Sequence, residues 1–370
     1  MRIHYFSNSI IPSTQANSVH VMKMCDAFSN NGAEVTLFGK KSKLDLSHLD
    51  ILKEYDVKNY FDLKLLNQHY KKKFGVIEYL MRLSKIYNSK QNPDIFYGRH
   101  IHSLLILKNK GIPLFYEAHH LPITEIRRKM ESWLFNSKNF KKLIVISNSL
   151  KKDYLLKFSN LNEKDILVLH DGADIREFRS KPAFYDSQFQ VGYIGQLYKG
   201  KGVELIIELA NLMPDIKFNI IGGNKKQVYE WEYKLKNTHN LRFWGHVPFN
   251  KTEEYRQAMD VLIAPYQKQV MSKGGDEISK WMSPLKLFEY MASKKPIITS
   301  NHEVITEFLD TESAILCDPS NINEWRDAIL LVKNNKNLRD KLVDNAFNKL
   351  KNNYTWSRRT EILLNEFNNN

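Results

Sequence analysis

Short runs of β-branched and aromatic residues alternate along the chain with longer segments in which apolar residues recur every three or four positions. This alternation predicts parallel strands joined by helices, because a helix must cross one face of the sheet to reach the start of the next parallel strand. The first helical segment runs from Ser18, which we expect to cap it, to Gly32. The strands predicted in the first half of the chain are residues 2–7, 34–39, 94–99, 113–118, 142–147 and 166–172.

A polar segment at residues 175–188, which contains Pro182, interrupts the alternation and is typical of a linker. A second series of strands follows, at residues 190–195, 217–223, 241–247, 260–266, 296–300 and 314–318. The sequence therefore predicts an α/β protein with two Rossmann-like, doubly wound domains facing each other across a cleft, with ligands at the carboxyl ends of the strands. We expect an N-terminal domain at residues 1–180, a C-terminal domain at 181–350, and a terminal helix at 351–370 that returns to the N-terminal domain.

The composition is that of a folded protein without a membrane span. At 370 residues, with 42% hydrophobic residues, the chain is long and apolar enough for two ordinary cores. No apolar run approaches the roughly 18 residues that a membrane-spanning helix needs, and the first ten residues lack the apolar centre of a signal peptide. Cys25 and Cys317 lie far apart in apolar segments, so we expect two buried free thiols and a cytoplasmic location.

The formal net charge of +14 favours polyanionic partners, namely anionic lipid, phosphorylated substrates or nucleic acid. An equally good interpretation is that the lysines only form a solvated surface. Nucleic acid is disfavoured because the chain contains no recognisable nucleic-acid-binding module. Residues 59–83 mix aromatic and leucine residues with lysines and are predicted to form a surface helix. That helix either contacts an anionic membrane surface or simply faces solvent or core.

A glycine-rich turn directly follows the strand at residues 190–195, and residues 195–202 read GQLYKGKG. Glycines let the backbone approach a ligand closely, and the N-terminus of the following helix would favour an anion. Lys201 would add a point charge, although turns of this kind also occur without a ligand. The G-x-G-x-x-G fingerprint is absent here and in the first strand-to-helix turn, which disfavours a nicotinamide-dependent dehydrogenase.

A second candidate site is the helix predicted within residues 281–300. Ser283 is expected to cap this helix, Pro284 suits its first turn, and the amides of Leu285 and Lys286 would form an anion site together with the lysine ammonium. Glu289, four residues after Leu285, could accept hydrogen bonds from a vicinal diol such as a ribose. The alternative is a surface glutamate paired with a lysine.

Four segments carry a resemblance to a known family. In chain order they read ANSVHVMKMCDAF, LHDGADIREF, VGYIGQLYKGKGVELI and SPLKLFEYMASKKPIITS, and together they resemble the family-4 (group 1) retaining glycosyltransferases of the GT-B fold. The resemblance implies that Glu289 binds the nucleotide ribose, that Lys201 neutralises the donor diphosphate and that His119 reaches the donor sugar. It also places backbone groups of His246 and Val247 at the base, and Ala16 and Asn17 near the phosphates and the acceptor.

The implied reaction moves a sugar from a nucleotide-sugar donor, a UDP-sugar before a GDP-sugar, to a glycan or lipid-linked glycan acceptor in bacterial envelope polysaccharide synthesis. The sugar keeps its anomeric configuration, the leaving phosphate helps to deprotonate the acceptor, and neither a metal nor a cofactor is implied. Lys201, Lys286 and His119 are the expected catalytic residues. The N-terminal domain would bind the acceptor and the C-terminal domain the donor, in the cytoplasm or on the inner face of the plasma membrane.

The sequence departs from the family pattern at three places. Trp281 stands where the family often has the first of two glutamates, Gln196 replaces the first cation of the usual phosphate-binding pair, and Ala16-Asn17 replaces a glycine pair. We retain Gln196 as a donor-binding candidate and expect Lys286 to supply part of the missing charge. Two alternatives stay open: a UDP-sugar 2-epimerase, and a nucleotide-sugar-binding protein without catalytic activity.

Overall fold

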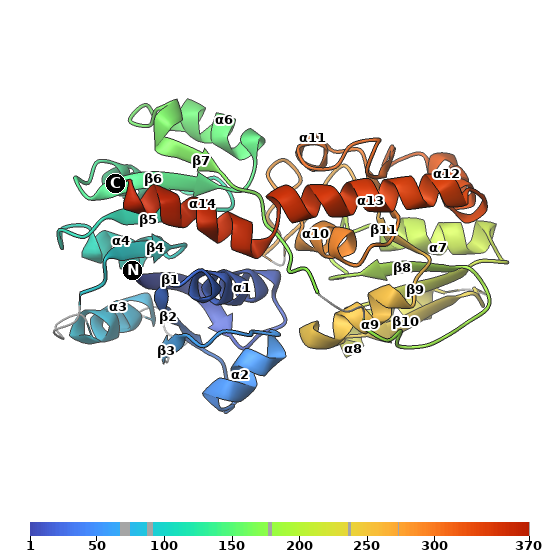
Figure 1. Cartoon of the computed structure of the whole chain (residues 1–370), viewed down its shortest axis with the longest axis horizontal. Coiled ribbons are helices and arrows are strands. Elements are labelled where there is room, and N and C mark those ends of the chain that lie inside the picture. The colour runs from blue at the N-terminus through green and yellow to red at the C-terminus, as the bar shows by residue number, and fades with distance from the viewer. Residues whose placement is uncertain (67–74, 87–91, 177–179, 236–237, 273, 370) are drawn as a thin grey trace. The chain divides into compact units, whose positions relative to one another are not determined.

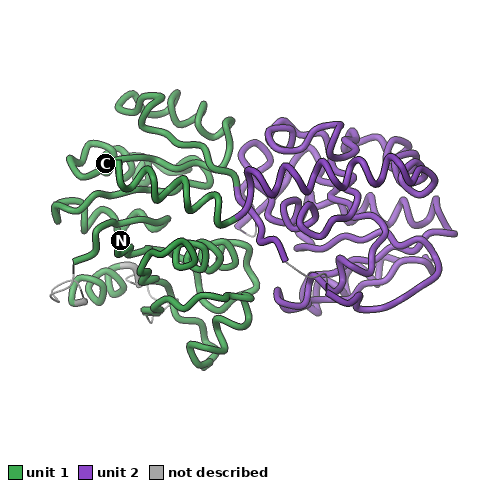
Figure 2. The backbone as a smooth tube through the Cα atoms, in the orientation of Figure 1, with its two compact units in different colours: residues 1–170, 356–370 green, residues 171–355 purple. Residues whose placement is uncertain are grey.

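The computed structural model describes residues 1–369 except 67–74, 87–91, 177–179, 236–237 and 273. The chain forms two compact units: unit 1 contains Met1–His170 and Trp356–Asn370, and unit 2 contains Asp171–Thr355 (Figure 2). The first boundary lies earlier than the predicted residue 180. The reason is that the backbone N–H of Asp171 donates to Ser283 Oγ (2.8 Å) and that of Ala173 to the carbonyl of Tyr354 (3.1 Å), which ties this segment to unit 2.

Unit 1 is built on a seven-stranded parallel sheet with the order β3-β2-β1-β4-β5-β6-β7 (Figure 1). Its register pairs His4 with Thr36 on one side of β1 and with Phe96 on the other. The direction of winding reverses between β1 and β4, which makes the carboxyl ends of these two strands a topological switch point. The strands are β1 (Arg2–Ile11), β2 (Glu34–Lys41), β3 (Asp62–Leu66), β4 (Ile95–Gly98), β5 (Leu114–Ala118), β6 (Phe140–Val145) and β7 (Ile166–Val168).

Three sequence expectations for unit 1 are wrong. Residues 59–83 are not one helix, because Asp62–Leu66 pairs with β2 as an edge strand and only Gly75–Ile86 is helical; residues 67–74 of this prediction lie outside the described part. Ser18 lies inside the first helix rather than at its cap, since its hydroxyl bonds the carbonyls of Ser13 and Gln15. The strand predicted at residues 166–172 ends at Val168.

The helices of unit 1 include one contributed by the end of the chain. α14 packs on α1, and its Phe367 ring lies 4.5 Å from the Phe115 ring and 5.9 Å from the Phe28 ring, centroid to centroid. The terminal segment thus completes the core of unit 1. The helices are α1 (Ala16–Asn30), α2 (His48–Glu54), α3 (Gly75–Ile86), α4 (Ile101–Leu107), α5 (Glu125–Phe135), α6 (Asn148–Lys157), the short 3₁₀ helix η1 (Glu163–Asp165) and α14 (Trp356–Asn368).

Unit 2 is built on a six-stranded parallel sheet with the order β10-β9-β8-β11-β12-β13. The winding reverses between β8 and β11, so a second switch point lies at the carboxyl ends of those strands. The strands are β8 (Gln190–Ile194), β9 (Lys217–Ile221), β10 (Leu241–Gly245), β11 (Val261–Ala264), β12 (Ile297–Ser300) and β13 (Ile315–Cys317). Each coincides with a strand that the hydrophobic pattern predicts.

Helices cover both faces of the sheet of unit 2. Val261 and Ile263 of β11 belong to the core cluster formed with α7 and α12, whereas Leu262 and Ala264 belong to the cluster that contains α10. This two-residue alternation is the geometry of a strand buried on both faces. The helices are α7 (Val203–Leu212), α8 (Lys225–Lys234), the 3₁₀ helix η2 (Phe249–Lys251), α9 (Thr252–Gln257), α10 (Leu285–Ala292), α11 (Glu303–Thr306), α12 (Ile322–Asn334) and α13 (Lys336–Asn353).

Two expectations from composition can be compared with the structure. Cys25 and Cys317 are free and buried, as predicted. Among the described helices, none combines the length and the apolar character that crossing a bilayer requires.

Candidate functional site

The glycine-rich turn connects β8 to α7 and packs tightly against the segment after β11. Gly200 and Gly202 have φ angles of +82° and +84°, where residues with a side chain are strained. A Cβ atom at Gly200 would lie 1.9 Å from the carbonyl oxygen of Gln269, and one at Gly202 would lie 2.0 Å from that of Pro265. Both glycines are therefore required by backbone conformation and by space. This turn fixes the position of Lys201 between them.

Lys201 and Lys286 bring two ammonium groups to one aromatic ring. The Nζ of Lys201 lies 4.9 Å from the centroid of the Tyr266 ring, and the Nζ of Lys286 lies 5.2 Å from it. Lys286 also lies over Tyr193, with 3.7 Å between its Nζ and the ring centroid. A ring face stabilises a cation without neutralising its charge. The Nζ of Lys286 is buried and has no hydrogen-bond partner among the described residues, so its donors are available to an anion.

Burial disfavours the charged form of both lysines. Burial lowers the pKa of Lys201 to about 8. Burial also lowers the pKa of Lys286 well below its ordinary 10.5, Lys201 lowers it further, and Glu289 opposes the shift. A bound anion would reverse the effect of burial by favouring the protonated form of both groups. The pair is therefore matched to a ligand with more than one negative charge.

Gly195 makes room for Lys286 at the end of β8. A Cβ atom on Gly195 would lie 2.5 Å from the Nζ of Lys286 and 2.8 Å from its Cε. The next residue, Gln196, accepts a 2.6 Å hydrogen bond through its carbonyl from the Tyr193 hydroxyl. The side chain of Lys286, from α10, therefore lies beside the glycine-rich turn that contains Gln196. The predicted donor-binding role of the Gln196 side chain stays a prediction.

The helix α10 is anchored to the sheet by Tyr290. The Ile194 N–H donates a 2.9 Å hydrogen bond to the Tyr290 hydroxyl, which also contacts the Ile263 carbonyl at 3.4 Å. Pro284 occupies the N-cap position and Leu285 begins the helix. The predicted capping by Ser283 is wrong, because its hydroxyl accepts the backbone N–H of Asp171 instead. An anion site at the Leu285 and Lys286 amides stays a prediction.

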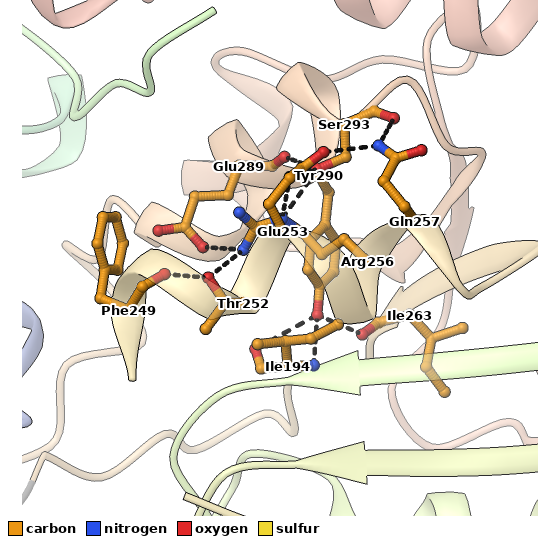
Figure 3. A network of polar contacts seen from close by, with 10 residues as sticks. All are labelled: Ile194, Phe249, Thr252, Glu253, Arg256, Gln257, Ile263, Glu289, Tyr290 and Ser293. Atoms are coloured by element: carbon orange, nitrogen blue, oxygen red, sulfur yellow. Dashed lines mark hydrogen bonds and ion pairs between the residues drawn. The ribbon is translucent and has the colours of Figure 1, made fainter. Parts of the chain in front are cut away.

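Glu289 is mostly buried rather than a surface residue, since only 17% of its side chain is exposed, and its Oε2 accepts a 3.0 Å hydrogen bond from Nη1 of Arg256. Figure 3 shows Arg256 within a network that joins α9 to α10. The single N–H of the guanidinium Nε is shared between Glu253 Oε2 and Ser293 Oγ, both at 2.9 Å. Burial would raise the pKa of Glu253, but Arg256 and three hydrogen bonds lower it below the ordinary value, so Glu253 is anionic.

His246 and Val247 follow β10 directly. Gly245, the last residue of β10, has a φ of +70°, and its carbonyl accepts a 2.7 Å hydrogen bond from the Gly222 N–H after β9. His246 is exposed and Val247 is half-buried against the core cluster around α10. Both residues thus lie at the carboxyl edge of the sheet of unit 2. Contacts of their backbone groups with a base stay a prediction.

In unit 1, His119 is held by a buried carboxylate. Its Nε2 lies 2.6 Å from Oε1 of Glu117, which also lies 3.1 Å from Nε2 of His20 and 3.3 Å from Nη2 of Arg359. Tyr97 donates a further hydrogen bond to Glu117. Burial would raise the pKa of Glu117, but Arg359 and then the histidines lower it well below its usual range. The carboxylate is therefore charged and accepts from Nε2–H of His119.

This contact fixes the state of the His119 ring. Burial lowers the pKa of His119 to about 3, Arg99 adds to the shift, and the hydrogen bond to Glu117 opposes it. The ring is therefore neutral at physiological pH. Because Nε2 carries the proton that Glu117 accepts, Nδ1 carries a lone pair and can act as an acceptor.

Ala16 and Asn17 are the first two residues of α1 rather than part of the loop before it. The Asn17 carbonyl lies 3.4 Å from Ser9 Oγ on β1, and the Ser18 N–H donates to the Gln15 carbonyl at 3.1 Å. These contacts start the helix two residues earlier than the predicted cap. Proximity to phosphates or an acceptor stays a prediction for Ala16 and Asn17.

The structure thus groups the predicted residues in two places. Lys201, Gln196, Lys286 and Glu289 gather at the end of β8 and on α10 in unit 2, whereas His119 lies in unit 1, where its ring contacts His20 of α1 with 4.9 Å between centroids. Sequence reasoning missed the residues that hold these groups, namely Arg256, Glu117 and Arg359. Glu117 is a charged residue within an apolar segment, which is a weak signal, whereas Arg256 and Arg359 lie among polar residues and have no local signal.

Two protein families match this chain. Residues 174–349 match the family described as "Glycosyl transferases group 1", and residues 18–177 match the family described as "Glycosyltransferase Family 4". The two matches are adjacent and together span residues 18–349.

Curated relatives and solved structures agree with this match. The chain is 28% identical over 231 residues to an uncharacterized glycosyltransferase of Methanocaldococcus jannaschii, covering 58% of this chain and 55% of that protein. It is 23% identical over 252 residues to the poly(ribitol-phosphate) alpha-N-acetylglucosaminyltransferase of Staphylococcus aureus, covering 65% and 47%. The chain therefore spans about half the length of these relatives. The structure of Anabaena HepE in complex with UDP and glucose aligns over 100% of both chains, with a TM-score of 0.72 at 14% identity.

Proposed function

Because the two matches together span residues 18–349, the chain belongs to the group 1 glycosyltransferases, and from this premise we propose that it transfers a sugar from a nucleoside diphosphate sugar to an acceptor hydroxyl. The fold is the GT-B fold, as the sequence predicts, with two parallel α/β sheets that match solved glycosyltransferases. We propose UDP as the first candidate nucleotide and GDP as the second.

The observation that carries this proposal is the pair of lysines at the end of β8. Lys286 holds a buried ammonium without a hydrogen-bond partner among the described residues, and Lys201 shares the Tyr266 ring with it. The site lies at the switch point of the sheet of unit 2, where ligands of doubly wound sheets bind. A diphosphate supplies the two negative charges that this pair matches.

In the proposed reaction the bond between the anomeric carbon and the diphosphate oxygen breaks, and the acceptor oxygen forms its bond on the same face of the sugar. The acceptor proton passes to an oxygen of the leaving diphosphate, so no protein carboxylate is needed as a nucleophile. Lys201 and Lys286 would stabilise the negative charge that develops on the leaving group, which is the kind of interaction that usually contributes most to catalysis. We propose that neither a metal nor a cofactor takes part.

Other residues would orient the donor. The Glu289 carboxylate is suited to accept hydrogen bonds from the ribose diol, and backbone groups at His246 and Val247 would contact the base. Nδ1 of the neutral His119 ring would accept a hydrogen bond from a hydroxyl of the donor sugar, because its Nε2–H is committed to Glu117. This gives His119 a hydrogen-bonding role rather than that of a general acid.

We propose a glycan or lipid-linked glycan as the acceptor, in a pathway that builds an envelope polysaccharide in the cytoplasm. The Staphylococcus aureus relative, named for transfer to poly(ribitol-phosphate), supports a polymeric acceptor. Exposed Ile77 and Met81 on α3 (54% and 60% exposed), together with the +14 net charge, support contact with an anionic membrane surface.

The test is a thermal-shift and calorimetric screen of UDP, GDP, CMP and their common sugar conjugates, with and without magnesium. Metal-independent stabilisation by one diphosphate family, lost in Glu289→Ala, is the expected result. Binding of no member of the panel would contradict the proposal. Incubation of the preferred nucleotide sugar without acceptor then separates transfer from 2-epimerisation, because only an epimerase converts the sugar when it is alone.

A further inference from the structure

Lys286 and Glu289 lie three residues apart on α10, a spacing at which opposite charges on a helix usually meet. They are not an ion pair in this structure. The Glu289 carboxylate bonds Arg256 instead, and the Lys286 ammonium is buried over the Tyr193 ring without a hydrogen-bond partner in the described chain. Arg256 therefore competes with Lys286 for this carboxylate, and in the ligand-free protein it prevails.

The guanidinium can hold Glu289 because it is itself immobilised. Arg256 is 6% exposed at its side chain, and its Nε bonds both Glu253 and Ser293. Its Nη1 donates to Thr252 Oγ1 and to Glu289 Oε2, both at 3.0 Å (Figure 3). A guanidinium is planar and cannot turn one N–H without moving the others, so these contacts aim Nη1 at Glu289.

The partners of Arg256 are fixed in turn. Ser293 Oγ lies 2.8 Å from both Glu253 Oε2 and the Glu289 carbonyl, and its one O–H can donate to either acceptor. Gln257 Nε2 donates to Glu253 Oε1 and to the Ser293 carbonyl. The network thus joins α9 to the last turn of α10, the helix that carries both Lys286 and Glu289.

We infer that Arg256 is a positioning residue that acts on both halves of the nucleotide site. It holds the Glu289 carboxylate for the ribose diol and keeps that carboxylate off Lys286, whose ammonium stays available for the diphosphate. This inference rests on the proposed function, because it assigns the ribose to Glu289 and the diphosphate to Lys286.

The test compares the affinities for UDP and 2′-deoxy-UDP, measured by calorimetry with the full chain, because their ratio reports the contact between the ribose hydroxyl and Glu289. In the unaltered protein we expect UDP to bind about tenfold more tightly, the size of a hydrogen bond to a charged group. In Arg256→Met the ratio should fall below about threefold, because the carboxylate loses its contact with the guanidinium. Affinity for 2′-deoxy-UDP should also fall, by about tenfold, because Glu289 pairs with Lys286.

A second substitution separates positioning from simple loss of structure. In Arg256→Met/Glu289→Gln the side chain at 289 is neutral and no longer neutralises Lys286. Affinity for 2′-deoxy-UDP should therefore recover to within about threefold of the unaltered protein, whereas the UDP ratio stays low. A damaged fold would not be repaired by a further substitution. Lys251→Met removes an exposed ion pair with Glu254 beside the same helix and should change neither value.

The outcomes are distinct. An unchanged UDP ratio in Arg256→Met, or a double variant that binds 2′-deoxy-UDP no better than the single one, overturns the inference alone. An unaltered protein that binds neither UDP nor GDP overturns the proposed function and the inference with it. If Arg256→Met does not fold, Arg256→Lys carries the same test, since a lysine keeps the charge beside Glu253 but lacks the fork that reaches Glu289, and its UDP ratio should also fall.

Discussion

The ammonium of Lys286 lies 3.7 Å from the ring centroid of Tyr193, a residue of β8 just before the glycine-rich turn. This contact explains how the Nζ of Lys286 can be buried without a hydrogen-bond partner among the described residues. The ring face supplies part of the stabilisation that water would otherwise provide, and Tyr266 supplies more. A cation held in this way keeps its donors available for a phosphate.

Lys201→Ala should lower turnover on the order of 100-fold, the scale on which removal of one group that stabilises developing charge slows an enzyme. The measurement is kcat with the donor identified in the nucleotide screen. Lys199→Ala, an exposed lysine two residues away, is the matched control and should keep full activity. A fall in kcat of less than about 3-fold in the folded Lys201 variant would remove this residue from the catalytic role.

Gly195→Ala should weaken UDP binding by about tenfold, because its Cβ would stand 2.5 Å from Nζ of Lys286 and would displace the ammonium. The melting temperature should change little, since the displaced atoms are the far end of a flexible side chain. Gly274→Ala is the control, because the nearest atom to its Cβ would be at 3.3 Å in an exposed loop. Equal UDP affinity in the two variants would show that Lys286 does not contact the nucleotide.

UDP affinity should fall as the pH rises through about 8, the value to which burial lowers the pKa of Lys201. The bound diphosphate favours the protonated form of Lys201, so binding above this pH is accompanied by the uptake of a proton. Calorimetry at pH 8.5 in two buffers of different ionisation enthalpy measures this uptake. The uptake should shrink in Lys201→Met.

The effect of the same pKa shift on folding has the opposite sign. Between about pH 8 and 10.5, the pKa of an unfolded lysine, the unfolded state binds one more proton than the ligand-free folded state, so Lys201 makes the ligand-free protein more stable as pH rises.

Arg359→Met should lower the free energy of unfolding by about 3–5 kcal/mol, because it leaves the buried Glu117 carboxylate without its cationic partner. Urea unfolding followed by circular dichroism measures the change. The neighbouring Arg358→Met removes an exposed pair with Glu361 and should stay within about 1 kcal/mol. Similar values for the two variants would mean that Glu117 does not depend on Arg359.

The chain should sediment with vesicles that contain anionic lipid, and the bound fraction should fall as salt rises. The double variant Ile77→Asp/Met81→Asp should bind less, because both side chains are exposed on α3. Leu212→Asp, at a residue that is 53% exposed on α7, is the control and should bind as the unaltered protein does. Binding that is independent of lipid charge would contradict the proposed membrane contact.

The hydrophobic pattern predicts every strand of unit 2 but misses β3 of unit 1. Central strands of a parallel sheet are buried on both faces and therefore appear as continuous apolar runs. β3 lies at the edge of its sheet, and its DLKLL sequence is only partly buried, so its pattern is no stronger than that of an exposed helix. Its pairing with β2 decides its conformation, and that contact is not visible locally.

The candidate site was predictable where the signal is local. Gly200, Gly202 and Lys201 are adjacent in the sequence, and their conformation follows from the strand-to-helix turn that they form. Ser283 precedes an apolar run, as a capping serine does, but its hydroxyl accepts a hydrogen bond from the backbone N–H of Asp171, 112 residues away. The partner of Glu289 is likewise distant, since Arg256 lies on another helix 33 residues earlier. Such pairings depend on how the helices pack and have no local signature.

The return of α14 to unit 1 has a consequence for synthesis on the ribosome. Glu117 is translated 242 residues before Arg359, its cationic partner. Until α14 leaves the exit tunnel, the nascent first unit lacks the cationic partner of Glu117 and the Phe367 ring that packs on Phe115, whereas all of unit 2 has already been translated before α14. We therefore expect the second unit to be able to acquire its native structure first, reversing the order in which the two units begin.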